Sequence, residues 1–165
     1  MVFDIFRSIE QSGLSIWIRE SDSVLAYWFI LSIHAIGMGL LVGASVLIDV
    51  RILGLPSYLP LEPLKRLYRF IWVGFWIQVA SGILLLVAYP TKSLTNPDFY
   101  LKLTLIGIAM TLMQKLKNRV LSNSSLSETA MMAKGRSFAM WSLILWAGAI
   151  TAGRLLAYTY STLTA

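Results

Sequence analysis

Five side chains with binding chemistry lie in long apolar stretches of the sequence: His34, Met38, Gln78, Lys102 and Arg154. His34 is the single histidine, and an imidazole inside a membrane either binds a metal ion or hydrogen-bonds a neighbouring helix. Met38 follows one helical turn later, where its thioether could be a second metal ligand or could simply fill space. Gln78 is suited to a hydrogen bond that orients a ligand-binding side chain.

The two cationic side chains require partners if they lie inside a membrane. Arg154 stays protonated, so it needs an anion. The anion is either an acid at the interface or an anionic group of a bound cofactor, and the candidate acids are Glu20, Asp22 and Asp98. Lys102 could extend to the headgroups or contact the same anion. Because charged groups in lipid are costly, these side chains are expected to face the inside of a bundle.

Four apolar stretches are long enough to hold these residues inside a membrane. Of 165 residues, 57% are hydrophobic and only 13% are charged, whereas a soluble domain carries about a quarter charged residues. Crossing about 30 Å of hydrocarbon takes roughly 20 helical residues. The sequence therefore predicts an all-α integral membrane four-helix bundle with spans at about residues 24–48, 70–89, 99–116 and 137–160.

Residues 1–22 are predicted to form an N-terminal segment apart from the four-helix domain of residues 23–165. Apolar residues recur there at roughly helical spacing and the run is broken at Ser12-Gly13. The pattern is not that of a signal peptide. It favours two short amphipathic helices lying in the membrane interface with Trp17 as an anchor.

Helix boundaries are marked by capping residues and prolines. Pro90 is expected to end the second long helix, and Asn96 to cap the third, with Pro97 in its first turn. Ser127 is expected to cap a short helix over residues 130–134 in the connection before the fourth span. Gly39 and Gly43 have the spacing that brings two helices close together, or that leaves room for a flat cofactor beside His34.

Basic residues fix the expected orientation. Nine of the 14 Lys and Arg residues lie in or beside the first and third connections. Positive residues favour the cytoplasmic side. The protein is therefore predicted to span a bacterial inner (cytoplasmic) membrane with both termini on the outer side. The formal charge of +6 then indicates lipid contact and not nucleic-acid binding.

Several chemistries find no support in the sequence. There is no cysteine, so thiolate metal sites and disulfides are excluded. His34 has no obvious acid partner for a hydrolytic triad, and no glycine-rich phosphate loop is present. The two halves share no pattern of an inverted-repeat transporter.

Two motifs resemble a known group of membrane proteins. The run Ser32 to Gly37, which leads to Ile48-Asp49-Val50-Arg51, is similar to the first helix of the copper-resistance D (CopD) and HemJ-like proteins. Tyr100 to Ile106 resembles that group's LKLxLV segment, and Asn118-Arg119 its NR ending. The segments Ile9–Ser21 and Gly153–Thr159 resemble the opening and close of a set of short bacterial four-helix inner-membrane proteins.

The resemblance implies haem b binding, as in HemJ-like protoporphyrinogen oxidases, with His34 and Lys102 at the positions that matter there. With a single histidine, one protomer cannot supply the two histidine ligands of a bis-histidine haem. Three arrangements remain: five-coordinate haem on His34, His/Met ligation with Met38 or another methionine, or haem shared between protomers.

The preferred hypothesis is a haem b protein for electron transfer or for porphyrin- or quinol-linked oxidation. In it His34 is an axial ligand, Gln78 supports it, and Arg154 with Lys102 pairs with the propionates. The alternatives are a cofactor-free subunit or scaffold of a larger membrane complex, and a copper or small-solute permease. Partners are expected to be the bilayer and either further copies of the chain or other membrane subunits.

Overall fold

Four long helices dominate the computed structural model of the protein, which describes residues 2–20, 25–55, 58–123 and 125–159. They are α3 (Leu25–Ile52), α5 (Tyr68–Ala88), α7 (Pro97–Leu116) and α8 (Glu128–Tyr158). Each belongs to a helical stretch that is long and apolar enough to cross a membrane. The predicted all-α bundle with four spans is therefore confirmed, and the described residues contain no strand.

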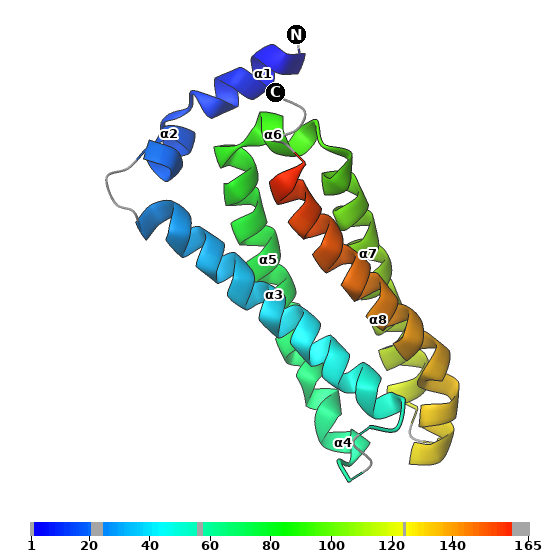
Figure 1. The fold of residues 1–165 in the computed structure, drawn as a ribbon. Helices are drawn as coiled ribbons and strands as arrows, with labels where there is room; N and C mark the ends of the chain where they lie inside the picture. Colours follow the sequence, from blue (N-terminus) through cyan, green and yellow to red (C-terminus); the bar gives the residue numbers. More distant parts are fainter. Residues whose placement is uncertain (1, 21–24, 56–57, 124, 160–165) are drawn as a thin grey trace.

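Short helices close the two ends of the bundle. Figure 1 shows α1 (Val2–Glu10), α2 (Gly13–Glu20) and α6 (Pro90–Leu94) at one end, which we call the α6 end. The opposite α4 end carries α4 (Leu61–Leu64), a 3-10 turn over Lys65–Leu67 and a π-type turn over Lys117–Leu121. The break between α1 and α2 at residues 11–12 confirms that the N-terminal segment forms two short helices.

The predicted helix starts are largely confirmed. The Asn96 side chain accepts a hydrogen bond from Asp98 N at 2.9 Å, with Pro97 in the first turn of α7. Ser127 Oγ accepts from Ala130 N at 3.3 Å. The expected separate helix over residues 130–134 is wrong, however, because it continues without interruption into α8. No proline or glycine-induced turn separates the two segments, so the helix that begins at Ser127 runs on into the apolar span.

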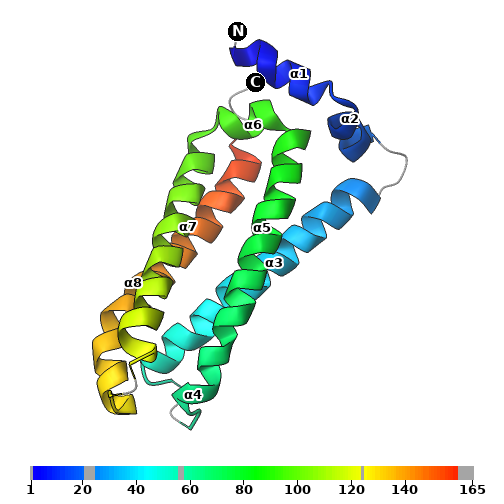
Figure 2. The same ribbon diagram turned by 180° about the vertical axis from the view of Figure 1, so that it is seen from behind.

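The four long helices pack as two pairs. α3 lies along α5 and α7 along α8, and a further contact joins α3 to α8. Figures 1 and 2 show α3 crossing α5 obliquely. The crossing lies at Gly37 and Gly74, where a Cβ on Gly74 would come within 2.6 Å of Leu41 N and 2.8 Å of Gly37 O. Hydrogen atoms in place of side chains therefore allow the two backbones to touch.

Gly39 and Gly43, which have the spacing typical of close helix packing, do not make this contact. Both are exposed, and a Cβ at either position would meet nothing within 4 Å in the described part of the chain. They lie on a different face of α3 from Gly37, because successive helical residues are rotated by about 100°. Within one copy of the chain, the packing role belongs to Gly37 and Gly74.

The buried core is concentrated toward the α4 end. There Ile48, Ile52, Tyr68, Met113 and Leu116 pack among all four long helices and are almost completely inaccessible. At the α6 end a much smaller cluster joins α2, α3 and α5 through Ile18, Ile30 and Ala88. The half of the bundle near α6 is thus the half with room for a ligand.

A buried arginine ties the α4 end together. Arg51 is 5% exposed. Its guanidinium binds the carboxylate of Glu128 and the carbonyl of Leu59 and lies 3.3 Å from the sulfur of Met132. These contacts join the end of α3 to the following connection and to the start of α8. Arg51 therefore joins these three segments through polar contacts.

Replacing Arg51 by methionine should destabilise the protein, because the Leu59 carbonyl loses its donor while the apolar stem is retained. Leaving such a group unsatisfied costs about 1–3 kcal/mol, which should appear as a lower melting temperature in detergent. Lys65→Met is the matched control, since Lys65 pairs at 2.6 Å with Glu62, whose side chain is 79% exposed. That pair should contribute only about 0–1 kcal/mol. Equal losses in both variants would contradict a structural role for Arg51.

Candidate functional site

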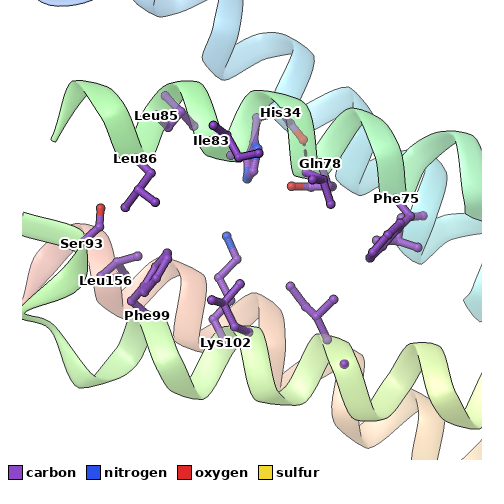
Figure 3. Close-up of a pocket in the computed structure, with 16 residues that line it drawn as sticks. His34, Phe75, Gln78, Ile83, Leu85, Leu86, Ser93, Phe99, Lys102 and Leu156 are labelled. Carbon is purple, nitrogen blue, oxygen red and sulfur yellow. Dashed lines mark hydrogen bonds between the residues drawn. The ribbon is translucent and has the colours of Figure 1, made fainter. Parts of the chain in front are cut away.

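A largely apolar cavity of about 510 Å³ lies between α3, α5 and α7 in the half of the bundle near α6. Its walls carry aromatic and aliphatic side chains, among them Leu41, Phe75, Ile83 and Phe99, and α8 contributes Leu156. Figure 3 shows Phe75 and Phe99 at opposite ends of this space. The size and lining are those of sites that hold a small organic molecule or cofactor.

His34 enters the cavity from α3 with its orientation fixed by α5. Its Nδ1 lies 2.8 Å from Ser81 Oγ. The Ser81 hydroxyl donates its own proton to the carbonyl of Ile77 at 2.6 Å. The serine oxygen is therefore the acceptor for an Nδ1–H of His34, which leaves the Nε2 lone pair available. This is the tautomer of a histidine that binds a metal through Nε2.

Gln78 also supports the histidine, through the backbone. Its Nε2 donates to the His34 carbonyl oxygen at 3.0 Å, and the side chain lines the cavity. One turn further along α5, Gly82 carries no side chain, and a Cβ there would lie 3.6 Å from His34 Cε1. The α5 face opposite His34 thus combines hydrogen-bonding groups with free space for the ring.

Lys102 reaches the same cavity from α7. Figure 3 shows its amine directed across the space toward the wall that carries His34. Its stem passes Gly153 of α8, where a Cβ would lie 3.5 Å from Lys102 Cδ and Cε. Lys102 is therefore directed inward, away from the snorkelling position at the edge of the bundle.

A second, more polar hollow of about 650 Å³ adjoins the first and shares His34 and Lys102 with it. It extends to the α6 end, where Arg19, Lys92 and Glu10 line it. Arg19 donates to the Glu10 carbonyl at 2.6 Å, and its guanidinium lies 6.0 Å from the ring centroid of Tyr89. The Glu10 carboxylate accepts from Thr91 N at 3.2 Å, which anchors α1 on α6. The mouth of the cavity therefore carries an excess of positive charge.

Two predicted site residues lie outside the cavity. Met38 is half-buried on α3 but does not line either hollow. Arg154 is exposed on α8, so the expectation that it faces inward is wrong. Its neighbour Gly153 faces the second hollow, and one residue of helix rotates the next side chain by about 100°. Of its candidate partners, Asp98 accepts a hydrogen bond from Thr159 at 3.1 Å, and Asp22 lies outside the described residues.

The structure thus brings together His34, Gln78 and Lys102, and it adds residues that the sequence did not single out. The most important is Ser81, which is 3% exposed and fixes the imidazole. Its position was detectable in principle, because Gln78 and Ser81 are three residues apart and share one helix face. Arg19 belongs to an amphipathic segment, and no local pattern links it to a cavity.

The fold and the cavity define a class: a helical membrane protein with four candidate spans and a ligand-sized cavity in one half of its bundle. Comparison of the chain with protein-family models, with curated proteins and with solved structures finds no match in any of the three.

Proposed function

We propose that this protein binds haem b in the cavity between α3, α5 and α7, with His34 as an axial ligand. The observation that carries the proposal is the Ser81 hydrogen bond to His34 Nδ1 at 2.8 Å, which leaves Nε2 to donate to iron. A histidine whose other ring nitrogen is held by a protein acceptor is the usual arrangement at metal sites. When bound, haem supplies one-electron redox chemistry.

The other residues of the cavity fit the two parts of a haem molecule. Phe75, Ile83 and Phe99 provide apolar walls for a flat macrocycle. Lys102 inside the cavity, and Arg19 at its mouth, provide cations for two propionates. Lys102 keeps the role that the sequence suggested for it, and Arg19 takes the one suggested for Arg154, whose position on the exposed face suits contact with lipid headgroups.

The position of Met38 affects the proposed coordination. Because Met38 lies outside both hollows, we propose that His34, and not Met38, would hold the haem iron. Electron transfer or porphyrin- or quinol-linked oxidation are the reaction classes that we propose for this site.

Orientation and location are part of the proposal. The basic residues of the first and third connections lie around the α4 end, which we propose to be cytoplasmic in a bacterial inner membrane. The cavity would then open toward the outer side, where α1 and α2 would lie in the interface.

The direct test is the absorption spectrum of the purified full-length protein, with pyridine-haemochrome analysis and titration of haem b into protein isolated without it. A Soret band with about one haem per chain is the expected result. Protein that neither contains haem nor takes it up would overturn the proposal.

Lys102 and Arg154 allow a sharper comparison. Lys102→Leu should weaken haem binding by about tenfold or more, because a hydrogen bond to a charged group contributes roughly 1.5–3 kcal/mol. Arg154→Leu, on the exposed face of α8, should leave binding unchanged. Haem titration followed at the Soret maximum measures both affinities. A larger effect of Arg154 than of Lys102 would contradict the assignment of the propionate site.

A second candidate, a cofactor-free subunit of a larger membrane complex, is supported by one observation. Gly39 and Gly43 form a bare, exposed strip along α3, of the kind that packs against another helix. Detergent-solubilised protein that lacks haem and is obtained only together with other chains would favour this candidate.

A further inference from the structure

Asp49 is a buried acid that the cavity in the other half of the bundle does not use. It lies in the last turn of α3, which continues past the expected end at residue 48 to Ile52. Its side chain is 0% exposed. Both carboxyl oxygens are inaccessible, and neither has a hydrogen-bond partner of normal geometry among the described residues.

Two hydroxyl groups near Asp49 each also contact another atom. From α5, the Tyr68 hydroxyl donates to the carbonyl of Met113 at 2.9 Å. From α8, the Ser142 hydroxyl interacts with the carboxyl and also lies 3.4 Å from Met113 Sδ. One helical turn after Ser142 on α8, Trp146 is also buried, and its Nε1 has no partner in the described part of the chain.

The cations of this region do not neutralise Asp49 either. The guanidinium of Arg51, two residues along α3, is bound to Glu128 and Leu59. The ammonium of Lys117, which follows α7, lies over the ring of Tyr68 at 5.3 Å from its centroid. No ion pair between Asp49 and another described residue is present.

An ionised carboxylate in this position would be strongly disfavoured. Burying an unpaired charge costs several kcal/mol even after the protein relaxes. The position in the last turn of α3 adds to this, because the carbonyl groups at a helix C-terminus create a negative potential. A neutral carboxylic acid avoids both costs and keeps a polar group that can still exchange a proton.

We propose that Asp49 is a proton-binding site inside the bundle, protonated in the folded protein at neutral pH. An acidic residue inside a membrane span is typically a functional group, and proton transfer is a common role. The site is distinct from the haem cavity and requires no cofactor.

Infrared difference spectroscopy on the cofactor-free full chain tests the proposal directly. Protein labelled with ¹³C at the aspartate carboxyl carbon should show the C=O stretch of one protonated carboxyl at pH 7, shifted by the label. Asp49→Asn should remove this band, while Asp98→Asn, at the start of α7, should retain it. Absence of the band at pH 7, or its persistence in Asp49→Asn, would overturn the proposal.

Two further measurements keep the test decisive if Asp49→Asn folds poorly. Ser142→Ala retains the acid, so it should keep the band but shift its frequency because the facing hydroxyl is lost. A monovalent cation is the rival ligand. Replacing choline chloride by sodium chloride at constant ionic strength should leave the band unchanged, and its loss in sodium would assign Asp49 to a cation site and overturn the proposal.

Stability gives an independent readout. A carboxyl that is protonated when folded and ionised when unfolded binds more protons in the folded state, so stability falls as pH rises. The unfolding equilibrium constant of the wild type, relative to Asp49→Asn, should therefore increase with pH by up to about tenfold per unit above the range where a free aspartate titrates. A ratio that is flat, or that decreases with pH, would contradict protonation of Asp49.

Discussion

Replacing His34 by alanine is expected to abolish the Soret absorption of the purified protein. The sequence has no histidine other than His34, and Met38 lies outside the cavity. Neither a second imidazole nor Met38 can therefore replace His34 as the ligand of the proposed haem. Ser32→Ala is the matched control, because Ser32 is on the same helix but is exposed. It should retain the wild-type spectrum. An unaltered Soret band in His34→Ala would exclude His34 as the ligand.

Two related variants separate loss of the ligand from loss of the fold. His34→Gly with added imidazole should regain a haem spectrum, since free imidazole can occupy the space left by the side chain and supply the same nitrogen. Ser81→Ala removes the acceptor of His34 Nδ1 and should reduce haem affinity by about 10- to 100-fold. If Ser81→Ala bound haem like the wild type, the hydrogen bond to His34 would have no role in the site.

The number and position of the long helices could be predicted from the sequence because the signal is strong and local. Long runs of apolar residues specify spans wherever they occur. Asn96 and Ser127 specify helix starts through hydrogen bonds made within three residues. One error, a separate helix over residues 130–134, arose because polarity was taken as a boundary, although the backbone continues regularly into the apolar segment.

The site was only partly predictable because it depends on helix rotation. His34, Gln78 and Lys102 lie within apolar spans and are expected to face inward, and they do line one cavity. Arg154 follows the same rule in sequence but lies at an exposed position of α8. Near the end of a span an arginine can extend to the headgroups. The expectation that a charged side chain faces the inside of the bundle is therefore weaker there. The burial of Asp49 likewise depended on how far α3 extends beyond its apolar run.

Replacing Gly74 by leucine is expected to prevent correct assembly of the bundle. A Cβ at this position would meet Leu41 N at 2.6 Å and Gly37 O at 2.8 Å, and both are backbone atoms that no change of rotamer can move. Overpacking of a well-packed interior costs about 1–3 kcal/mol and more where the backbone must shift. Because the crossing lies one turn from Gln78, separation of α3 and α5 should also break the Gln78 and Ser81 contacts to His34. Unfolding in detergent, followed by size-exclusion chromatography against temperature, measures the loss.

Gly39→Leu on α3 provides the matched control, because a Cβ at Gly39 meets nothing within 4 Å among the described residues. In an isolated copy of the chain it should be neutral or slightly stabilising, since glycine is a poor helix former by up to about 1 kcal/mol. A Gly74→Leu protein as stable as Gly39→Leu would show that α3 and α5 do not touch as described. If Gly39→Leu instead lowers only the apparent molecular mass, the exposed strip of α3 is an interface between subunits, and the Gly37–Gly74 crossing retains its role inside each one.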